Sequence, residues 1–382
     1  MIDSKTICFV NARFYPDLGG VERYTLELSK KLVDYGYKVI VVTTNIDDND
    51  SYEIFNGVII YRLPIFKGLG GRYPILKFNK KYFKILKNIK KEDIDFFVIN
   101  TRFYLTSILG LHIAKSKSKR SIVIEHGTGH FSVNNSLLDF FGRRWEHFVM
   151  NIVKLYKPRF YGVSKACNNW LLHFNVTASG VLYNGIDAHY KIKELKNLKS
   201  EYQIPNTALI VTYAGRFIQE KGIHVLIKAI EKVLEKNRNV YFFLAGSGPL
   251  ESMVSEFAIK SDRVFFEGKM DYDDLMNLFR CSDILVNPSM YPEGLPTVIL
   301  EAGAMGCAIV ATARGGTEEI ILSKKYGIII SEEDEREIFK AVNDLYNDPT
   351  YLKYISSNVK TRIIEGFDWS ILALNFIKVI KE

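Results

Sequence analysis

The sequence predicts an α/β fold made of two doubly wound domains, each with a parallel sheet. The chain has 382 residues, and at roughly 150 residues per domain that length suggests two domains. Short β-branched runs alternate with amphipathic helical patterns, and this alternation restarts in the second half of the chain. Such a pattern is typical of parallel sheets that are covered by helices on both faces. In these folds, ligands bind beyond the carboxyl ends of the strands, so we expect a cleft between the two domains.

The first half begins with a buried strand over Thr6–Asn11 and a helix over Val21–Tyr35, whose apolar positions recur at helical spacing. Further strands are predicted at Lys38–Thr44, Phe96–Asn100, Ser121–Glu125, Phe160–Val163 and Val181–Tyr183. A polar, lysine-rich stretch, His189–Asn206, lacks strand periodicity and is interpreted as the linker between the two halves.

The second half repeats the alternation. Strands are predicted at Ala208–Gly215, Val240–Ala245, Val264–Phe266, Ile284–Asn287 and Ala308–Thr312. Helices are predicted at Gly222–Lys236, Leu250–Ala258, Asp273–Cys281 and Thr297–Met305, with a last amphipathic helix over Ile371–Ile380.

Composition excludes several classes of protein. Hydrophobic residues make up 47% and charged residues 25% of the chain, a balance that disordered and fibrous chains do not have. Four scattered cysteines without a Cys-x-x-Cys pair argue against a disulfide framework or a thiolate metal site, and a reducing cytosol fits best. We expect no secretory signal and no membrane-spanning helix.

The positive charge of the chain is unevenly placed. The net charge is +8, but residues 1–190 hold 27 Lys/Arg and 16 Asp/Glu, a balance of +11, whereas residues 191–382 have a balance of −3. The first half is therefore expected to face an anionic partner such as phosphates, nucleic acid or a membrane.

Two glycine-rich loops follow predicted strands. In the segment Pro16–Glu22, Gly19 and Gly20 would let a ligand approach the backbone at the start of a helix, although a plain strand-to-helix turn also explains them. In the second half, Gly246 and Gly248 resemble the start of a dinucleotide fingerprint, but the third glycine is missing because Glu251 follows Leu250. A structural turn is the better interpretation there.

A pair of cations lies in the loop after the first strand of the second half. Arg216 and Lys221 stand between Gly215 and Gly222, at the carboxyl end of that strand. A diphosphate is well matched by a planar guanidinium together with an ammonium group. Either residue alone would more often be a solvated surface cation.

A second loop carries two carboxylates. Glu293 is followed by Gly294-Leu295-Pro296, which opens a helix whose first amides could bind an anion. Glu301 lies further along this helix among apolar and small residues, so an ionised carboxylate there needs a partner. Such a carboxylate can accept hydrogen bonds from the two hydroxyls of a ribose, unless Glu301 is simply an exposed helix residue.

Together these segments resemble the retaining GT-B glycosyltransferases of family four. Further matching pieces, in the order of the family, are Glu125-His126-Gly127, Gly162-Val163-Ser164-Lys165, Asn184-Gly185-Ile186-Asp187 and Gly315-Gly316-Thr317-Glu318-Glu319. The resemblance implies GT-B architecture with an acceptor-side domain over residues 1–188, to which a C-terminal helix at 367–382 returns. It implies a nucleotide-sugar domain over residues 189–366.

The resemblance also implies roles for single residues in transfer of a sugar from a nucleotide-sugar. Arg216 and Lys221 would hold the donor diphosphate, Glu301 the ribose, and Glu293 and His126 the sugar. The expected catalytic residues are His126, Glu293, Arg216 and Lys221. The donor-binding residues implied are Gly19, Gly20, Gly215, Met270, Gly294, Leu295, Pro296, Thr297 and Glu301. His126 alone would more often be a structural histidine, and its position after a strand favours the site.

The chemistry implied needs no metal and no cofactor. Departure of the leaving group places negative charge on the diphosphate, which two cations can stabilise. The resemblance implies front-face attack, so Glu293 is not expected to be a nucleophile. The pairs Asp93–Asp95 and Asp271–Asp273 fit the Asp-x-Asp pattern of metal-dependent enzymes, but capping is the commoner explanation for both.

The segment Lys67–Lys91 concentrates the basic charge, with nine Lys/Arg and no acid. Ile75, Phe78, Tyr82 and Ile89 recur at helical spacing, which predicts a basic amphipathic helix. Relatives with lipid-linked acceptors often dock on the inner leaflet through a basic N-terminal domain. We therefore expect peripheral contact with an anionic membrane, a cytoplasmic location at its inner face, and no nucleic-acid partner, because no nucleic-acid motif is present.

The expected reaction is transfer of a hexose or N-acetylhexosamine from a nucleotide-sugar to a glycan or lipid-linked acceptor in surface polysaccharide or glycolipid synthesis. A UDP-sugar is favoured as donor. The alternatives are a GDP-mannose-type donor, a sugar-nucleotide epimerase of the same fold and, outside enzymes, a basic nucleic-acid-binding module. A glycan phosphorylase is disfavoured because it would need a longer chain with a cofactor lysine.

Overall fold

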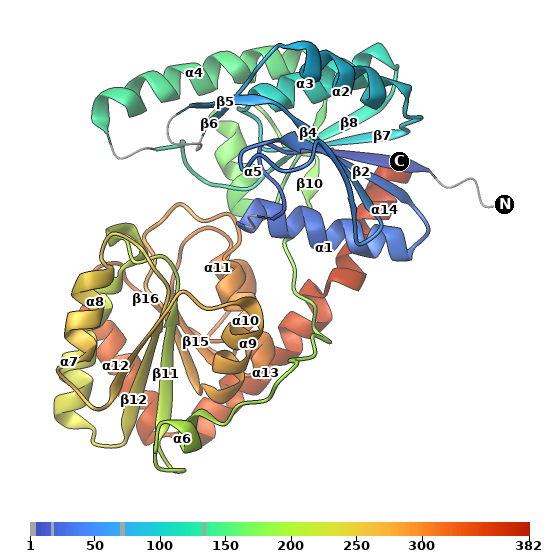
Figure 1. The fold of residues 1–382 in the computed structure, drawn as a ribbon. Coiled ribbons are helices and arrows are strands. Elements are labelled where there is room, and N and C mark those ends of the chain that lie inside the picture. The colour runs from blue at the N-terminus through green and yellow to red at the C-terminus, as the bar shows by residue number, and fades with distance from the viewer. Residues whose placement is uncertain (1–4, 17–18, 69–72, 133–134) are drawn as a thin grey trace. The chain divides into compact units, whose positions relative to one another are not determined.

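A computed structural model describes residues 5–16, 19–68, 73–132 and 135–382 of the chain. Its contacts divide the chain into two compact units (Figure 1). The N-terminal unit comprises Met1–Asn184 and Trp369–Glu382, and the C-terminal unit comprises Gly185–Asp368. Each unit has its own sheet and its own core, and each is described separately below.

The N-terminal unit is built on an eight-stranded sheet with the order β10-β9-β8-β7-β1-β2-β4-β3. Neighbouring strands are parallel except for β3 and β4. The strands are β1 (Thr6–Val10), β2 (Lys38–Thr44), β3 (Tyr52–Phe55), β4 (Val58–Leu63), β7 (Phe96–Asn100), β8 (Arg120–Glu125), β9 (Arg159–Gly162) and β10 (Gly180–Val181). The strand order reverses between β1 and β7, so the loops after these two strands diverge and leave room for a ligand.

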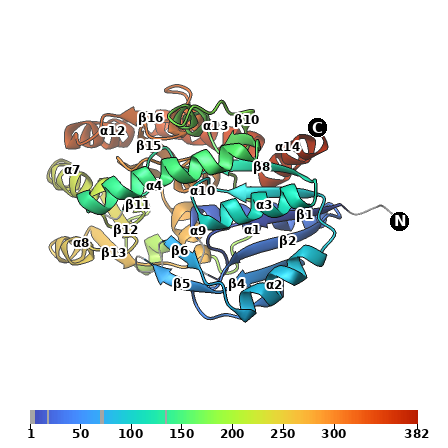
Figure 2. The same ribbon diagram turned by 90° about the horizontal axis from the view of Figure 1, so that it is seen from above.

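Helices cover both faces of this sheet (Figures 1 and 2). One face packs on α1 (Gly20–Asp34) and α14 (Trp369–Lys381), where Phe9 of β1 stacks on Phe376 of α14 at 6.0 Å between ring centroids. The other face shares a core with α2 (Lys80–Lys91), α3 (Leu105–Ser116), α4 (Ser136–Leu155) and α5 (Lys165–Leu172). The C-terminal helix α14 therefore completes the N-terminal unit, although the whole C-terminal unit precedes it in the sequence.

The C-terminal unit has a six-stranded parallel sheet with the order β13-β12-β11-β14-β15-β16. The strands are β11 (Leu209–Ala214), β12 (Val240–Ala245), β13 (Val264–Gly268), β14 (Ile284–Asn287), β15 (Ala308–Thr312) and β16 (Ile328–Ile330). Helices α7 (Ile223–Lys236), α8 (Glu251–Ala258) and α12 (Glu335–Asn347) share one core with the sheet, and α9 (Tyr272–Cys281), α10 (Thr297–Met305) and α13 (Pro349–Phe367) contact its strands from β11 to β15. The strand order reverses between β11 and β14.

Two short helices complete the C-terminal unit. The predicted linker contains α6 (Leu198–Glu201), and α11 (Thr317–Ile320) follows β15. Five predicted strands have the bounds found in the structure, β2, β7, β12, β14 and β15, because each is a run of buried β-branched and apolar residues.

The predicted basic helix is shorter than expected. Residues Ile65–Gly68 (β5) and Tyr73–Leu76 (β6) form an antiparallel hairpin, so Ile75 is on a strand, and Phe78 precedes the helix. Pro74 disfavours a helix at that point, and the side chain of Asn79 caps α2 by accepting a hydrogen bond from the amide of Tyr82 at 2.9 Å. Residues 69–72, which include Arg72, lie outside the described residues. From Lys80 to Lys91 the helix is amphipathic as predicted, with Tyr82, Ile85 and Ile89 buried.

None of the helices within the described ranges combines the length and the apolarity that a membrane crossing needs.

Candidate active site

In the C-terminal unit, the loops after β11 and β14 gather the predicted cations and one of the predicted carboxylates. Lys221 lies in a short 3₁₀ turn, Gln219–Lys221, and its ammonium group forms an ion pair with the carboxylate of Glu293. The ring of Tyr291 lies beneath both cations, 5.2 Å from the guanidinium carbon of Arg216 and 5.1 Å from Nζ of Lys221. Arg216 is exposed, whereas Lys221 and Glu293 are half-buried. The two cations therefore sit on one aromatic platform at the edge where the strand order reverses.

Close backbone contacts hold these loops together. Gly222 has φ +71°, and a Cβ there would lie 2.1 Å from the carbonyl oxygen of Pro288. Gly315, after β15, has φ +55°, and its Cβ would lie 2.3 Å from the carbonyl oxygen of Glu293. The amide of Met290 donates to the carbonyl of Glu220 at 2.8 Å. Only glycine fits such close left-handed positions, so the loops after β11, β14 and β15 form one packed layer under the cations.

Glu293 and Glu301 have different surroundings. Glu293 lies in the loop before α10, where its carboxylate also accepts a hydrogen bond from the hydroxyl of Ser289 at 3.2 Å. Glu301 lies on α10 itself and is only 8% exposed. The residue before α10 is Pro296, whose side chain cannot accept hydrogen bonds from the amides of the first helical turn. The arrangement leaves that turn suited to an external anion.

The remaining predicted donor-binding residues lie on the same edge of this sheet. Gly294, Leu295 and Pro296 are buried in the loop before α10, and Thr297 is half-buried at its first position. Met270 follows β13 and is half-buried. Gly215 directly follows β11, and a Cβ on Gly246 would lie 1.8 Å from its carbonyl oxygen. The interpretation of Gly246 as part of a structural turn is therefore confirmed, since its backbone supports the loop of Arg216.

In the N-terminal unit, Gly19 and Gly20 open α1 directly beyond β1, and both are exposed. Asp17 and Leu18 of the same loop lie outside the described residues. Gly19 has an extended backbone, with φ −86° and ψ −166°, so its conformation does not require glycine. A Cβ on Gly20 would meet no described atom within 4 Å. Neither backbone conformation nor described packing explains Gly20, which favours the close approach of a ligand over a plain turn.

His126 is held by a buried chain of side-chain hydrogen bonds. Its Nε2 lies 2.8 Å from Oδ1 of Asn100, and Nδ2 of Asn100 donates to Oδ1 of Asn11 and to the hydroxyl of Thr25, both at 2.9 Å. Because the amide nitrogen of Asn100 serves those two acceptors, its Oδ1 must accept from His126. His126 Nε2 therefore carries the proton, and Nδ1 keeps its lone pair.

The same chain reaches the glycine turn. Nδ2 of Asn11 donates to the hydroxyl of Thr25 at 2.8 Å, and that hydroxyl donates to the carbonyl oxygen of Val21 at 2.9 Å. Asn11, Thr25 and Asn100 are almost completely buried. Burial lowers the pKa of His126 from 6.5 to about 3, so the imidazole is neutral at physiological pH. His126 and the start of α1 are thus one rigid element at the point where the strand order reverses.

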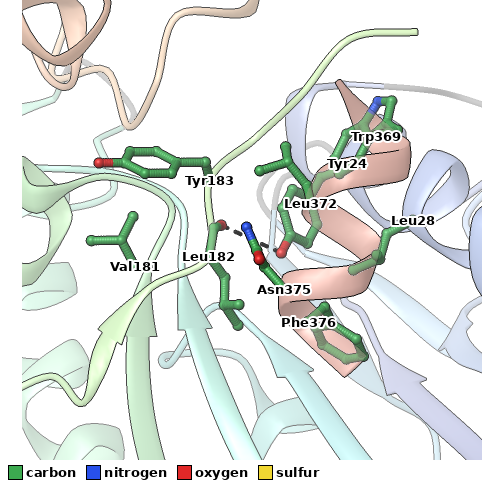
Figure 3. A pocket seen from close by; sticks show the side chains of 9 residues that line it. All are labelled: Tyr24, Leu28, Val181, Leu182, Tyr183, Trp369, Leu372, Asn375 and Phe376. Carbon is green, nitrogen blue, oxygen red and sulfur yellow. Dashed lines mark hydrogen bonds between the residues drawn. The ribbon is translucent and has the colours of Figure 1, made fainter. Parts of the chain in front are cut away.

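Tyr24 supports His126 from the side of α1. Its ring meets that of His126 edge to face at 4.9 Å and that of Trp369 at 5.4 Å. Its hydroxyl donates to the carbonyl oxygen of Leu182 at 3.5 Å, across a small cavity between α1, α14 and the end of β10 (Figure 3). The cavity has a volume of about 20 Å³, which is room for a water molecule and far too little for a sugar. The cavity is a packing gap. The contact that links the C-terminal helix to His126 is made by Tyr24, whose ring packs on both Trp369 and His126.

A buried cluster of charges lies beneath the loop of His126, and sequence reasoning missed it. Arg102, after β7, is completely buried between the carboxylates of Glu125 and Glu146, with 2.8 Å from its Nη2 to Oε2 of Glu146. The other oxygen of Glu125 accepts hydrogen bonds from the amides of His126 at 3.0 Å and Gly127 at 3.2 Å. Glu125 therefore fixes the backbone of the loop.

In the two acidic pairs, Asp95, Asp271 and Asp273 make structural contacts. Asp271 caps α9 by accepting a hydrogen bond from the amide of Asp274 at 2.8 Å, and Asp273 accepts one from the hydroxyl of Tyr190 at 2.8 Å. Capping is confirmed for Asp271 but is wrong for Asp95. The carboxylate of Asp95 instead accepts a hydrogen bond from the amide of Thr6 at 2.9 Å and forms an ion pair with Lys119 at 3.2 Å. These contacts tie β1 to its neighbours because Asp95 directly precedes β7.

The structure thus assembles the predicted residues in two groups. Arg216, Lys221 and Glu293 touch one another or share the ring of Tyr291, and Glu301 lies on the helix that follows their loop. In the other unit, His126 is joined through Asn100 and Thr25 to the carbonyl oxygen of Val21, the residue after Gly20. The first group can hold and stabilise an anion, and the second offers a neutral hydrogen-bonding imidazole beside a glycine turn.

Comparison with known proteins gives both units family matches. Residues 18–190 match the model of glycosyltransferase family 4, and residues 195–362 match the model of glycosyl transferases group 1. An uncharacterized glycosyltransferase of Methanocaldococcus jannaschii is 25% identical over 96% of both chains. The gpi3 subunit of the phosphatidylinositol N-acetylglucosaminyltransferase of Schizosaccharomyces pombe is 26% identical over 84% of this chain and 69% of its own.

Solved structures share the fold at lower identity. Sucrose-phosphate synthase of Thermosynechococcus elongatus superposes with a TM-score of 0.78 at 20% identity, covering 99% of this chain and 98% of its own. HepE of Anabaena, solved in complex with UDP, gives a TM-score of 0.76 at 17% identity and covers 99% of both chains. These neighbours show the GT-B fold, an α/β architecture of two Rossmann-like domains.

Proposed function

The chain is a glycosyltransferase that belongs to family 4 and to the group 1 glycosyl transferases, and on this premise we propose that it is a retaining enzyme with a UDP-sugar donor. The transferred group would be a hexose or N-acetylhexosamine, and the acceptor a hydroxyl of a glycan or of a lipid-linked sugar. The observation that carries the proposal is the pair of cations on Tyr291, at the edge where an open parallel sheet binds its ligand.

The donor diphosphate would bind Arg216 and Lys221. Arg216 offers a planar fork of donors and Lys221 a compact charge, and the Lys221–Glu293 ion pair places the carboxylate next to the bound phosphate. Glu293 is then positioned for the hydroxyls of the sugar. Glu301, buried on α10, would accept hydrogen bonds from the ribose hydroxyls, and the amides of the first turn of α10 would contact the phosphate or the sugar.

Catalysis would rest on stabilising the charge that develops on the departing diphosphate. Two preorganised cations can lower that barrier without a divalent ion, in the way of an oxyanion hole. The reaction passes through a transition state with oxocarbenium character. His126, neutral and with its Nδ1 lone pair available, would hold a sugar hydroxyl.

The relatives favour a donor with UDP over donors with other nucleotides. HepE has been solved with UDP-glucose as well as with UDP, and the yeast relative is named for transfer of N-acetylglucosamine to phosphatidylinositol. A GDP-mannose-type donor remains the second candidate, because the site residues named above contact phosphate, ribose and sugar and leave the base to backbone groups.

A lipid-linked acceptor at an anionic membrane is the favoured acceptor class. Beyond the lysines of α2, the structure exposes apolar side chains on α4, which covers the same face of the sheet (Figure 2). An apolar groove of about 420 Å³ lies beside α4 and is lined by Tyr73, Ile75, Phe103, Leu105, Phe131 and Trp145, among others. Such a lining suits a hydrocarbon chain better than a glycan, and the adjacent basic charge suits anionic headgroups.

A donor panel tests the reaction. The purified enzyme is incubated with UDP- and GDP-sugars and a polyprenyl-diphosphate-linked acceptor, and nucleotide release, product mass and the anomeric configuration of the product are followed. We expect acceptor-dependent release of UDP and a product with the anomeric configuration of the donor. Interconversion of sugar nucleotides without an acceptor would instead identify an epimerase, and inversion at the anomeric carbon would exclude the retaining mechanism.

Metal dependence is tested in the same assay. We expect full turnover in an excess of chelator, because Arg216 and Lys221 carry the charge that a metal would otherwise neutralise. Activity that is lost in chelator and restored by manganese would contradict this expectation.

Membrane docking is tested by co-sedimentation with vesicles of phosphatidylglycerol and of phosphatidylcholine. We expect binding to the anionic vesicles only, weakening as salt rises. The triple variant Lys80→Glu, Lys84→Glu, Lys87→Glu should lose it, while the matched control Lys340→Glu, Lys353→Glu, Lys360→Glu in the C-terminal unit should not. Equal binding by both variants would contradict docking through α2.

A further inference from the structure

Three histidines from three separate elements meet in the N-terminal unit, away from the residues assigned above. His130 lies in the loop after β8, His147 on α4, and His173 at the residue that follows α5. One ring nitrogen of each lies within 4.8 Å of those of the other two. We propose that His130, His147 and His173 bind a divalent transition-metal ion of the zinc type.

The spacing of the rings is close to that of a metal site. Zinc binds imidazole nitrogen at about 2.0–2.1 Å, and tetrahedral geometry then places the ligand nitrogens about 3.3 Å apart. The rings therefore need to close by about 1.5 Å at most from the separation of 4.8 Å. His173 is exposed and His130 half-buried, so small side-chain rotations can provide that movement.

The carboxylate of Glu146 orients the ring of His130 through one of its two ring nitrogens. Nδ1 of His130 lies 3.1 Å from Oε2 of Glu146, which leaves Nε2 of His130 to face a metal. Glu146 is itself fixed, since it is buried, pairs with Arg102 and accepts the amide of Phe131 at 2.7 Å. A histidine that donates one ring N–H to a carboxylate and binds metal through the other nitrogen is the usual outer-shell arrangement of zinc sites.

An aromatic side chain preorganises the other rings. Trp170 stacks on His173 with ring centroids 4.8 Å apart and an angle of 10° between the rings. The same indole meets His130 edge to face at 5.0 Å. The rings of His147 and His173 lie 5.0 Å apart. These ring contacts hold the imidazoles close together before a metal binds, which reduces the entropy lost on binding.

The nearby charges decide which metals fit. The cations that oppose a metal ion here are Arg102, Arg143, Arg144 and Lys154, whereas Glu125 and Glu146 favour one. Magnesium and calcium, which need several oxygen ligands and bind mainly by charge, are therefore poor candidates. Three imidazoles instead favour zinc, copper or nickel, whose bonds to nitrogen are strong.

A bound ion would join the loop of His126 to two helices. His130 is four residues after His126 in the same loop, and the other two ligands lie on α4 and directly after α5. The site would thus stabilise the N-terminal unit and leave the donor-side cations untouched.

The test uses the full-length chain without an affinity tag, stripped with chelator, dialysed against zinc and analysed for metal content, with calorimetric titration of zinc in parallel. We expect one zinc ion per chain and a higher melting temperature with zinc. The double variant His147→Ala, His173→Ala should bind zinc at least tenfold more weakly, whereas the control His112→Ala, an exposed histidine of α3 in the same unit, should bind like the wild type.

Cobalt(II) gives a second readout, because its visible absorption reports nitrogen ligands and tetrahedral geometry directly. Development of that spectrum in the wild type and the control, and its loss in the double variant, supports the site. No zinc retained by the wild type, or equal retention by all three chains, overturns it. A histidine cluster that only packs, or only titrates, would give one of these two results.

Discussion

The two units place their candidate residues at equivalent points of their sheets but build them in opposite ways. In the C-terminal unit the groups beyond β11 are charged, with Arg216 exposed and Lys221 half-buried. In the N-terminal unit the groups at the carboxyl ends of β1 and β7, Asn11 and Asn100, are neutral, buried and joined by a hydrogen bond. One edge is suited to hold an anion by charge, and the other to hold an imidazole in one orientation.

The N-terminal unit also keeps charges, but it places them under the site. Arg102, Glu125 and Glu146 are buried together below the loop of His126. Exposed charges can leave their partners at little cost, whereas a buried charge cannot. The comparison therefore predicts that charge removal changes stability in the N-terminal unit and activity in the C-terminal unit.

The largest effect is expected for Arg102→Ala. Loss of this guanidinium leaves two buried carboxylates without their counter-charge, which costs about 3–5 kcal/mol of unfolding free energy. Urea unfolding followed by circular dichroism measures it. The matched control is Lys232→Ala, which breaks a more exposed ion pair with Glu335 at 3.0 Å and should cost at most about 1 kcal/mol. Similar losses in the two variants would contradict the contrast between buried and exposed charges.

The next largest effect concerns turnover in the C-terminal unit. Arg216→Ala and Lys221→Ala each remove one cation from the proposed diphosphate site, and each should lower kcat by about 10²–10³. Arg216 is exposed, so its variant should unfold within about 0.5 kcal/mol of the wild type. Steady-state kinetics with the best donor of the panel measures the change.

Lys228→Ala serves as the control for these two variants, because Lys228 is an exposed cation on α7 outside the loop. It should have wild-type kinetics. Near-normal turnover of Arg216→Ala would remove the donor-site assignment, and a large loss of stability would mean that the charge supports the loop.

The difference between the units explains what could be predicted from sequence. Arg216 and Lys221 stand in a short loop that directly follows a strand and contains glycines, so local spacing alone places them at a strand end. The buried strands could be predicted equally well, because runs of β-branched and apolar residues such as Lys38–Thr44 and Ile284–Asn287 favour a strand strongly over other conformations.

The hydrogen-bond network could not be predicted in the same way. Asn11, Thr25 and Asn100 are common residue types that lie far apart in the sequence, and only the pairing of β1 with β7 brings them together. Arg102 and Glu146 likewise meet only in the tertiary structure. The exposed apolar surface of α4 was not predicted, although the many aromatic and leucine residues beside Arg143 and Arg144 indicate it in the sequence.

A smaller effect is expected from the network itself. Thr25→Val removes a hydroxyl that accepts hydrogen bonds from Asn11 and Asn100 and donates to Val21, while almost preserving the shape of the side chain. The orientation of His126 is then less well fixed, and kcat should fall about five- to tenfold, the equivalent of one neutral hydrogen bond. KM for the donor should change less, because the cations of the other unit are untouched.

Thr25→Ser is the matched control because it retains the hydroxyl. It should recover most of kcat, and the NMR shifts of His126 should be near those of the wild type. If both variants have the same kcat, the hydroxyl does not act through His126, and the network is only part of the core.

The smallest effect is the pH dependence of stability, because two groups of the N-terminal unit act in opposite directions. His126 has a pKa of about 3 in the folded chain and its ordinary value of 6.5 in the unfolded chain, so the unfolded chain takes up the proton first. Its stabilising contribution is complete above pH 6.5 and falls as the pH drops toward 3, by at most about 1.4 kcal/mol per pH unit. Burial raises the pKa of Glu146 from 4.5 to about 7, so its contribution is complete below pH 4.5 and is lost as the pH rises through 7.

Between pH 4.5 and 6.5 the contributions of His126 and Glu146 offset each other, but His130, whose pKa is lowered to about 4, adds a second loss of stability as the pH falls. The wild type should therefore become less stable as the pH falls through this window. His126→Gln removes one of these contributions while keeping a donor for Asn100. In that variant stability should rise as the pH falls through this window, relative to the wild type, whereas His112→Gln on the exposed face of α3 should follow the wild type. Parallel curves for all three chains would mean that His126 takes up a proton as easily when folded as when unfolded, and its neutral imidazole could then no longer explain the difference between the two units.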